Sequence, residues 1–389
     1  MERIKMKSLA SIPSNMPRSG IRVLMEMASK LKNVIHLEVG EPNFPTPKHI
    51  IESAFEAARQ GYTKYTSNSG FLSLREAISG KMKRVNGVDV PPDCITVTVG
   101  GVGGLSMSML ALVDPGDEVL VPDPGWPNYY SLVAISGAKV VKYPLFSANG
   151  FIPDVKDVEE RISKKTKVLL VNSPSNPCGS VFPREVVQSL NNLAEKYGFY
   201  ILSDEVYEEI IFDGEHICFA SVEEGSHTIS VFSFSKTYSM TGWRIGYVVA
   251  PSYASSLISK LQEPFVSCVS AISQKAAEAA LLGPQESIVE QREVYKSRCN
   301  QVVKMLSDAG LLINIPQGAF YILADISLTG MDSNTFAKKF LEESRVAVAP
   351  GETFGDNAAH CVRISLATKD DELIEGVGRL CEFCSRNKK

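Results

Sequence analysis

Short apolar segments alternate with helical segments along most of this chain, and this alternation most constrains its fold. Segments rich in Val, Ile, Leu, Phe and Tyr are predicted as strands at residues 95–99, 118–121, 139–142, 167–172, 200–203, 228–232 and 247–249. Helical segments such as residues 184–197 lie between the strands, and residues 254–262 follow the last one. Strands that alternate with helices form a mainly parallel sheet with helices on both faces. The sequence therefore predicts an α/β fold around one central sheet.

The two ends of the chain indicate a second, smaller domain. Residues 1–45 carry several Pro and Gly turn signals, and we expect them to form an N-terminal arm and part of the small domain. Residues 46–290 would form a large ligand-binding domain, and residues 291–389 a small α+β domain. The elements expected in the small domain lie at residues 293–308, 318–323, 333–344, 346–349, 362–366 and 370–386.

Charge and hydropathy argue against two classes of partner. The net charge is −4 and Lys and Arg form no block, so no nucleic-acid partner is expected. No apolar run approaches the roughly 18–20 residues of a membrane span. The charged start of the chain does not have the pattern of a secretory signal. We therefore expect no membrane partner.

The eight cysteines are scattered without a disulfide framework, a pattern typical of free thiols in a reducing compartment. We therefore expect a cytoplasmic location. Cys381 and Cys384 form a lone Cys-x-x-Cys pair, interpreted as two buried thiols on one helical face because no second ligand pair accompanies them. The five histidines show no metal-ligand spacing, so no metal site is predicted.

The segment from Ser233 to Gly246 carries the densest set of reactive groups and directly follows a predicted strand. Ser233 and Ser235 supply hydroxyls, Lys236 a primary amine, and Arg244 a guanidinium. Arginine offers planar, permanently charged donors that fit a phosphate, and a lysine amine can form a Schiff base with an aldehyde. For this segment alone, a solvated surface loop is the alternative.

Two further motifs also follow predicted strands. Asn176 lies between two prolines in Asn172-Ser-Pro-Ser-Asn-Pro-Cys-Gly179, so a rigid turn would hold its amide. Asp204 ends the next strand, and Tyr207 follows three residues later. A carboxylate at a strand end can meet a ligand, although a helix N-cap is the more common role of such an aspartate.

A glycine-rich turn and a tryptophan complete the set. Val99-Gly-Gly-Val-Gly-Gly104 lies between a strand and a helix, where backbone N–H groups can bind an anion. It is no dinucleotide fingerprint, because the pattern counted from Gly101 requires glycine where the chain has Ser106. Trp126 follows another strand and could stack on a flat ring, or it could pack in the core.

All five motifs lie at the carboxyl ends of predicted strands, where one crevice can collect them. Together they supply a carboxylate, an amine, an amide, a phenol, an indole and a group of phosphate donors. This combination suits one ligand in particular, a phosphorylated pyridine aldehyde with a protonated ring nitrogen.

The order and spacing of these motifs resemble those of fold-type I enzymes that use pyridoxal 5'-phosphate (PLP), in the class I and II aminotransferase family. Aspartate and aromatic aminotransferases belong to this family. The resemblance runs from Gly40-Glu-Pro-Asn-Phe-Pro-Thr-Pro47 to Val362-Arg-Ile-Ser365 and covers nearly the whole chain. It implies a large domain with a mainly parallel sheet, a smaller α+β domain, and PLP as the cofactor.

The resemblance also implies how PLP is held. Lys236 would bind it covalently, and Asp204 would pair with the ring nitrogen. Tyr207 and Asn176 would bond the ring 3'-oxygen, and Trp126 would stack on the ring. The phosphate donors would be the backbone N–H groups of Gly101 and Val102, together with Ser233, Ser235 and Arg244. Lys236, Asp204 and Tyr207 would be the catalytic residues.

Substrate and partner contacts are implied in the same way. Arg363 resembles the arginine that binds the substrate α-carboxylate, with Asn176, Trp126 and the backbone of Gly40 assisting. Ile21 would lie over the entrance to the site. Tyr65 resembles the tyrosine that reaches the phosphate in the neighbouring subunit, which implies a homodimer with shared active sites.

Two departures from the family bear on the substrate. Many members read Gly-Gly-Lys-Gln-Ala where this chain has Gly100-Gly-Val-Gly-Gly104, so Val102 offers an N–H but no amine. The helix expected at residues 105–113 is wholly neutral. Some aspartate-using relatives place a cation near there. We therefore favour neutral or aromatic donors without excluding aspartate, with 2-oxoglutarate or pyruvate as acceptors.

The implied activity is transfer of an amino group between an L-amino acid and a 2-oxo acid, in two half-reactions. The nearest alternative is a lyase, racemase, oxidase or decarboxylase with the same cofactor and fold, because a fold does not decide the chemistry. The sensing half of a transcription regulator is disfavoured, since only about 40 residues precede the Gly40 motif. A silent binding protein is disfavoured by the complete set of site residues.

Overall fold

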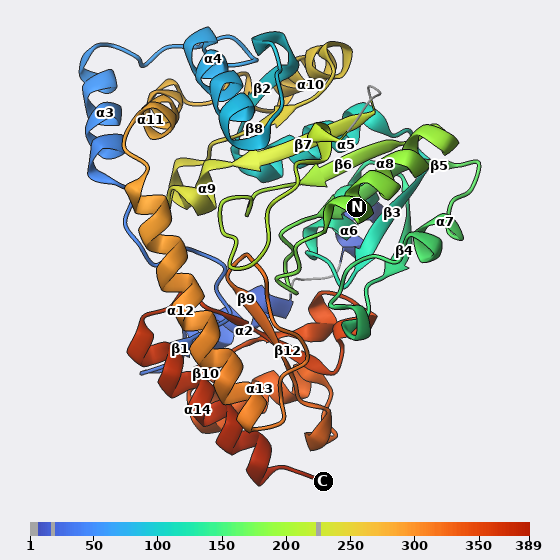
Figure 1. Cartoon of the computed structure of the whole chain (residues 1–389), viewed down its shortest axis with the longest axis vertical. Helices are drawn as coiled ribbons and strands as arrows, with labels where there is room; N and C mark the ends of the chain where they lie inside the picture. The colour runs from blue at the N-terminus through green and yellow to red at the C-terminus, as the bar shows by residue number, and fades with distance from the viewer. Residues whose placement is uncertain (1–6, 17–19, 223–226) are drawn as a thin grey trace, which may run out of the picture.

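A computed structural model describes residues 7–16, 20–222 and 227–389 (Figure 1). Its centre is a seven-stranded sheet in the order β2-β8-β7-β6-β5-β3-β4. The strands are β2 Ile95–Thr98, β3 Glu118–Asp123, β4 Lys139–Pro144, β5 Thr166–Asn172, β6 Tyr200–Asp204, β7 Thr228–Ser233 and β8 Gly246–Val249. Neighbours from β4 to β7 pair in parallel, and β8 runs antiparallel to both β7 and β2. The predicted α/β fold with a mainly parallel sheet is confirmed.

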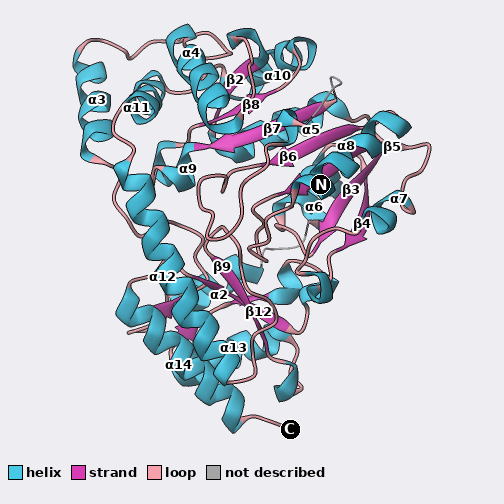
Figure 2. Ribbon diagram, in the orientation of Figure 1, coloured by secondary structure: helices cyan, strands magenta, loops and turns pink. Residues whose placement is uncertain are grey.

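Helices cover the two faces of this sheet (Figure 2). Successive residues of a strand point to opposite faces. The helices around the sheet are α3 Lys48–Arg59, α4 Leu72–Lys81, α5 Gly100–Leu112, α6 Asn128–Ile135, α7 Val155–Glu159, α8 Arg184–Tyr197, α9 Phe234–Thr237, α10 Ser252–Val266 and α11 Ala271–Leu282. In β5, Val168 and Leu170 pack in a cluster with α5, α6 and α10, whereas Leu169 and Val171 pack in a cluster with α7 and α8.

Helix α5 lies unusually close to the sheet because of its glycines. A Cβ atom at Gly104 would lie 2.9 Å from side-chain carbons of both Val231 and Val248. A larger residue at this position would push the helix away from β7 and β8. The close approach places the first turn of α5, with its free N–H groups, beside the carboxyl ends of the central strands.

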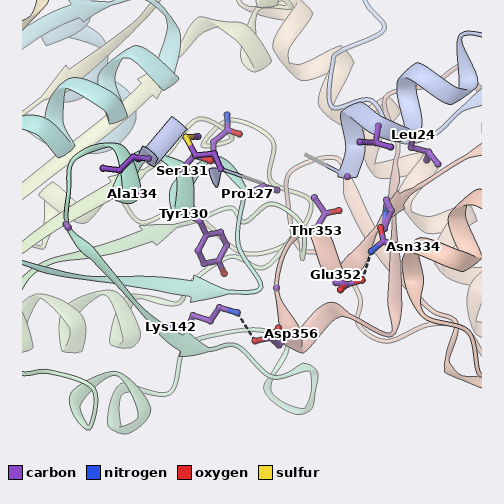
Figure 3. Close-up of a pocket in the computed structure, with 18 of the residues that line it drawn as sticks. Leu24, Pro127, Tyr130, Ser131, Ala134, Lys142, Asn334, Glu352, Thr353 and Asp356 are labelled. Atoms are coloured by element: carbon purple, nitrogen blue, oxygen red, sulfur yellow. Dashed lines mark hydrogen bonds and ion pairs between the residues drawn. The ribbon is translucent and has the colours of Figure 1, made fainter. Parts of the chain in front are cut away.

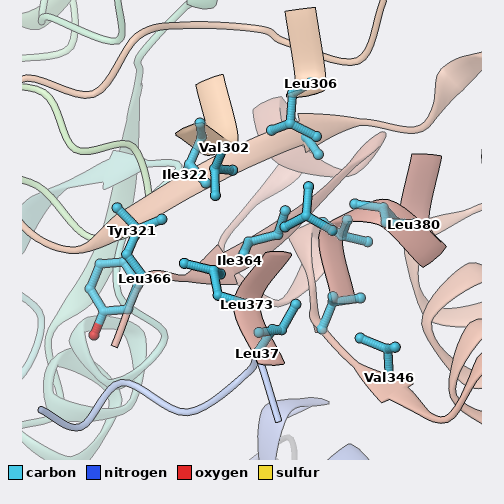
Figure 4. Packing of buried hydrophobic residues seen from close by; sticks show 14 of the residues in the cluster. Leu37, Val302, Leu306, Tyr321, Ile322, Val346, Ile364, Leu366, Leu373 and Leu380 are labelled. Atoms are coloured by element: carbon cyan, nitrogen blue, oxygen red, sulfur yellow. The ribbon is translucent and has the colours of Figure 1, made fainter. Parts of the chain in front are cut away.

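The C-terminal part of the chain is built on a second, antiparallel sheet in the order β11-β12-β9. Its elements are α12 Glu286–Asp308, β9 Tyr321–Asp325, α13 Ser333–Ser344, β10 Val346–Ala347, β11 Ala349–Pro350, β12 Cys361–Ser365 and α14 Asp370–Arg386. Figure 4 shows its core, in which Leu306 of α12 and Leu380 of α14 pack around Ile364 of β12. In Figure 1 this part lies below the large sheet, and α12 runs from one to the other.

Most of the N-terminal segment packs on this C-terminal part. Its elements are α1 Ser11–Asn15, α2 Gly20–Ala28 and β1 Ile35–His36. Of these, α2 and β1 contact the C-terminal part, whereas α1 contacts α6. Strand β1 pairs in parallel with β10. Leu24 of α2 and Leu37 are fully buried in the same core as Ile364. The segment that follows Leu37 therefore runs between the two parts of the molecule.

Several expected boundaries differ from the observed ones: the helix expected at 105–113 is α5 from Gly100 to Leu112, and the strand expected at 346–349 is divided into β10 and β11. Two further differences have a clear physical reason. Helix α12 begins at Glu286, seven residues before the expected start at 293, because Ile288, Gln291 and Tyr295 already form its buried face. Strand β9 begins at Tyr321 instead of 318, since Gly318 is held in a bridge to Ile211. Helix α12 crosses residue 290 without a break. The division into domains after residues 45 and 290 stays a prediction. No helix among the described residues is both long and apolar enough to cross a bilayer.

Candidate active site

One cavity of about 480 Å³ lies where β5, β6 and β7 end and α5 begins. It brings together every predicted site residue except Tyr65: Ile21, Gly40, Gly101, Val102, Trp126, Asn176, Asp204, Tyr207, Ser233, Ser235, Lys236, Arg244 and Arg363. Tyr65 lines a separate hollow beside Cys268 and is 89% exposed. The carboxyl ends of parallel strands are the usual ligand site of such a sheet.

Asp204, the last residue of β6, presents a buried carboxylate to the cavity. Tyr129 of α6 donates its hydroxyl to Oδ2 at 2.6 Å, and the backbone N–H of Val206 donates to Oδ1 at 3.4 Å. Burial raises the pKa of Asp204 to about 6, although the bond from Tyr129 lowers it. A carboxylate in this setting gains from a cationic partner inside the cavity.

Lys236 extends its amine into the cavity from α9, the short helix after β7. Ser233 caps this helix, because its Oγ accepts the N–H of Ser235 at 3.1 Å. Nζ of Lys236 donates to the backbone carbonyl of Gly40 at 2.6 Å. Burial lowers the pKa of Lys236 to about 8, partly opposed by the charge of Glu41. The amine is therefore easier to deprotonate than an ordinary lysine, as a nucleophile or base requires.

The turn into α5 and Arg244 form a cradle for an anion. Gly100 has a φ of +69°, and a Cβ atom there would lie 2.6 Å from a nitrogen of Arg244. A Cβ atom at Gly101 would lie 2.9 Å from Val206. Arg244 is fixed by a bond of 2.7 Å from Nη1 to the carbonyl of Thr241. Glycine is needed at Gly100 because the guanidinium approaches the helix N-terminus closely, and at Gly101 because Val206 does. The guanidinium and the helix N-terminus both attract anions.

Arg363 on β12 supplies a buried cation at the other end of the cavity. It donates to Oδ1 of Asn176 at 3.0 Å and to the backbone carbonyl of Glu38 at 2.6 Å. Its guanidinium carbon lies 4.2 Å from the ring centre of Tyr321, and its buried Nε has no hydrogen-bond partner. Burial lowers its pKa. Both bonds go to neutral oxygens, so an anion in the cavity would stabilise the guanidinium further.

Asn176 and Tyr207 are held in fixed orientations beside these groups. The backbone N–H of Asn176 donates to Oδ1 of Asn172 at 2.8 Å. Because Oδ1 of Asn176 accepts from Arg363, its Nδ2 group is the one that can donate into the cavity. The hydroxyl of Tyr207 shares a bond of 3.0 Å with that of Tyr321.

The remaining side of the cavity is apolar. Its residues come from α2, α5 and the segment after β1: Ile21, Met25, Val39, Val102 and Leu105. Among the described lining residues, the cations are Lys236, Arg244 and Arg363.

Several lining residues were not predicted from the sequence. Tyr129 and Tyr321 bond directly to predicted residues, and Asn172, Glu41 and Thr241 also line the cavity. Tyr129 follows Trp126 by one helical turn, and Asn172 opens the motif of Asn176, so proximity was a usable signal for these two. No local pattern marks Tyr321, which arrives from the C-terminal sheet.

A larger cavity of about 1020 Å³ lies between α2, α6 and the loop after β11 (Figure 3). Two of its polar contacts are the ion pair of Lys142 with Asp356 at 2.7 Å and the hydrogen bond from the amide of Asn334 to Glu352. It lacks the amine, carboxylate and arginines of the smaller cavity. Among the described residues, no cluster of His, Cys, Asp or Glu could hold a metal.

The smaller cavity fits PLP. A cation such as a protonated pyridine nitrogen would balance the buried carboxylate of Asp204, and a phosphate would fit the cradle at Gly100, Gly101 and Arg244. Lys236 lines the same cavity with a depressed pKa, as a residue that bonds an aldehyde requires. A ligand with these three chemical properties satisfies all of the groups at once.

Comparison with known proteins gives the same assignment. Residues 32–380 match the family model described as aminotransferase class I and II. The chain is 40% identical to an aspartate aminotransferase of Pyrococcus horikoshii, over 93% of this chain and 94% of that relative. It is 37% identical to aromatic-amino-acid aminotransferase 2 of Thermococcus litoralis, over 95% of this chain and 96% of that relative.

A solved structure has the same fold throughout. The structure of Thermus thermophilus aspartate aminotransferase with maleate matches at a TM-score of 0.93 and 37% identity, and the match covers 97% of this chain and 100% of that one. The chain therefore belongs to the class I and II aminotransferase family, and it is a PLP-dependent aminotransferase.

Proposed function

We propose that this enzyme takes its amino group from a neutral or aromatic L-amino acid and that Lys236 moves the proton in the reaction. The observation that carries this proposal is the cavity itself. A buried amine with a depressed pKa faces Asp204 and lies in one space with Arg363 and an apolar surface.

The site residues suggest how PLP is bound. Lys236 would hold it covalently, with the ring between Trp126 and Val206 and its nitrogen at Asp204. Tyr207 and Nδ2 of Asn176 would donate to the 3'-oxygen. The phosphate would lie at the first turn of α5, where its donors are Gly101, Val102, Ser233, Ser235 and Arg244. When bound, PLP supplies an aldehyde carbon and a protonated ring that takes up electrons from the bond that breaks at Cα.

Three side chains would carry out the transfer. Arg363 binds the substrate α-carboxylate through two N–H groups and so fixes the orientation of Cα. The amine of the substrate would first displace Lys236 from the cofactor. The freed Nζ, whose pKa burial lowers to about 8, would then take the proton from Cα and return it on the cofactor side. Asp204 remains ionised and keeps the proton on the ring nitrogen. Apolar side chains above the site exclude water from the amine.

The apolar side of the cavity supports the proposed substrate class. Ile21 and Met25 of α2 line the same cavity as Val102 and Leu105 of α5 and Arg363. The lining cations among the described residues are each required for the lysine, phosphate or α-carboxylate roles. A second carboxylate on the substrate would therefore find no further cation among these lining residues, and desolvating it without a partner is costly.

We also propose a homodimer with shared active sites and a cytoplasmic location. Tyr65 is exposed in one subunit, as expected if it reaches into another. Large exposed hydrophobic side chains on the neighbouring helices support an interface there: Phe55 of α3, Leu72 of α4, Phe265 of α10 and Leu282 of α11. The eight cysteines are all free thiols, which supports a reducing compartment.

Lys236→Ala should abolish both the covalent link and the proton transfer. Borohydride treatment followed by peptide mass analysis should place the cofactor on Lys236 in the wild type and on no peptide in the variant. Transamination should fall by at least about 10²–10⁴-fold. Lys196→Ala, which removes a surface lysine paired with Glu159, is the control. Transamination by Lys236→Ala at the wild-type rate would show that another residue carries the reaction.

Asp204→Asn should stabilise the cofactor-free protein while weakening PLP binding. The pKa of Asp204 rises from 3.8 to about 6 on folding, so the unfolded chain releases its proton first. The cofactor-free protein therefore loses stability between pH 4 and pH 6, and the loss, about 3 kcal/mol, is complete above pH 6.

At pH 7.5, denaturant titration should accordingly show the cofactor-free Asp204→Asn protein to be more stable by up to about 3 kcal/mol. Absorbance titration should show PLP affinity lowered by about tenfold or more, because a charged bond to the ring is lost. The exposed Asp213→Asn serves as the control. Unchanged affinity in Asp204→Asn would contradict the pairing with the ring nitrogen.

Val102→Lys should shift the enzyme toward dicarboxylate substrates, because it places an amine beside the apolar side of the cavity. We expect kcat/KM for aspartate, relative to phenylalanine, to rise by about tenfold or more. Val102→Met, of similar length and no charge, is the matched control. Equal ratios in the two variants, or a wild-type preference for aspartate, would contradict the proposed substrate class.

Mixed dimers test whether Tyr65 acts across the interface. Tyr65→Ala and Lys236→Ala should each be impaired alone. When the two chains are co-expressed, half of the dimers are mixed, and one site in each mixed dimer has both Lys236 and its partner's Tyr65. Activity should thus recover to about a quarter of the wild-type value. No recovery above the separate variants would place Tyr65 in its own subunit's site or outside any site.

A further inference from the structure

Asp123 begins the motif that carries Trp126, and its carboxylate has no role in the chemistry described above. The residue is 3% exposed. Its Oδ1 accepts the backbone N–H of Asn357 at 3.2 Å, and its Oδ2 faces Nζ of Lys142 at 3.3 Å. The Nδ2 group of Asn357 also donates to the carbonyl of Asp123 at 3.2 Å. Since Asn357 belongs to the C-terminal part, Asp123 joins the two parts of the molecule.

The loop of residues 351–358 fits closely against Asp123. A Cβ atom at Gly355 would lie 2.0 Å from Oδ1 of Asp123, so only glycine permits this approach. Next to it, the backbone N–H of Gly125 donates to the carbonyl of Phe354 at 2.9 Å. We refer to these contacts of Asp123 and Gly125 with residues 354–357 as the Asp123 clasp.

The Asp123 clasp adjoins two residues of the active site, Arg363 and Trp126. The ring of Phe354 is fully buried, and its centre lies 4.9 Å from the guanidinium carbon of Arg363. The same loop continues from β11, which pairs with β12 at Arg363. On the other side, Trp126 follows Asp123 in one short turn. The clasp therefore connects the backbone beneath Trp126 with the backbone beneath Arg363.

We propose that Asp123 is a positioning residue for substrate binding: its bonds to Asn357 hold Arg363 at the correct distance from the cofactor ring over Trp126. This inference rests on the proposed role of Arg363 in binding the α-carboxylate. Displacement of a positioning group by about 1 Å can cost about 10²-fold in rate. Without the Asp123 carboxylate, the clasp loses the acceptor for the N–H of Asn357, and the loop under Arg363 is free to shift.

The test uses the holoenzyme and two reagents that react with the lysine-bound cofactor whatever the natural donor is. Aminooxyacetate and methoxyamine share the same reactive O–NH₂ group, and only aminooxyacetate carries a carboxylate. The ratio of their second-order rate constants, followed by the loss of visible absorbance, therefore measures carboxylate binding by Arg363. Arg363→Lys gives the ratio for a site with impaired carboxylate binding, because lysine lacks the planar pair of donors.

Asp123→Ala should lower this ratio by about tenfold, with the methoxyamine rate nearly unchanged. Asp123→Asn keeps an oxygen for the N–H of Asn357 and should restore most of the ratio. Asp356→Asn is the matched control. It breaks the ion pair of the exposed Asp356 with Lys142, drawn as a dashed line in Figure 3, and leaves the pair of Lys142 with Asp123 in place. It should leave the ratio within about twofold because exposed ion pairs contribute little.

Asn357→Ala weakens the Asp123 clasp at the C-terminal part of the molecule, and the carboxylate of Asp123 keeps its ion pair with Lys142. The loss of the Nδ2 bond should lower the ratio by about threefold or more. A folded Asp123→Ala protein with the wild-type ratio would refute the proposal. If Asp123→Ala does not fold, a wild-type ratio in Asn357→Ala refutes it. Equal ratios in the wild type and Arg363→Lys would overturn the role of Arg363 itself, and with it this inference.

Discussion

The buried carboxylate of Asp204 is the group on which the arrangement of this active site depends. Burial at the end of a central strand makes this carboxylate harder to ionise, and its pKa is raised to about 6. The fold compensates in part with the hydroxyl of Tyr129 and the N–H of Val206. The charge of Lys236 stabilises the carboxylate in part. A ligand with a protonated ring, which we propose beside Asp204, would stabilise it further.

The other site groups come from two different sheets, the large mainly parallel sheet and the small antiparallel one. The parallel strands deliver Asp204, Asn176 and Lys236 to one edge of a rigid sheet, where they surround the position of the ring. Arg363 comes from a different sheet. It reaches the cavity only because the two sheets meet, and the meeting is fixed by specific polar contacts, among them those of Asp123 and Asn357. Cofactor chemistry and substrate orientation are thus supported by separate parts of the molecule.

Much of this could be predicted from the sequence, because the relevant residues directly follow apolar strands. Asp204, Asn176 and Lys236 were placed correctly by that rule alone, since a parallel sheet collects its carboxyl ends at one edge. The resemblance to the aminotransferase family added Arg363 and Gly40, which no local pattern connects to the site. The roles of these residues, the division into domains and the contact of Tyr65 with a second subunit stay predictions.

What could not be predicted has a common physical origin, which is contact between distant segments. Tyr129 has no pattern that would show its hydroxyl reaching β6 from α6. The bonds of Asp123 with Asn357 span 234 residues of sequence, and Tyr321 meets Tyr207 across 114. The early start of α12 was missed for a more local reason, because Gln291 is a polar residue on its buried face. Such details arise from tertiary packing, which overrides local preference.

The carbonyl groups of Glu38 and Gly40 have a consequence for how the enzyme is made. They accept hydrogen bonds from Arg363, 325 residues later, and from Lys236, 196 residues later. All seven strands of the large sheet precede residue 250, so they leave the ribosome before Arg363 does. A chain that stops before residue 363 would contain the whole large sheet and both carbonyl groups but would lack Arg363. The site becomes complete only when the last tenth of the polypeptide folds back onto the first.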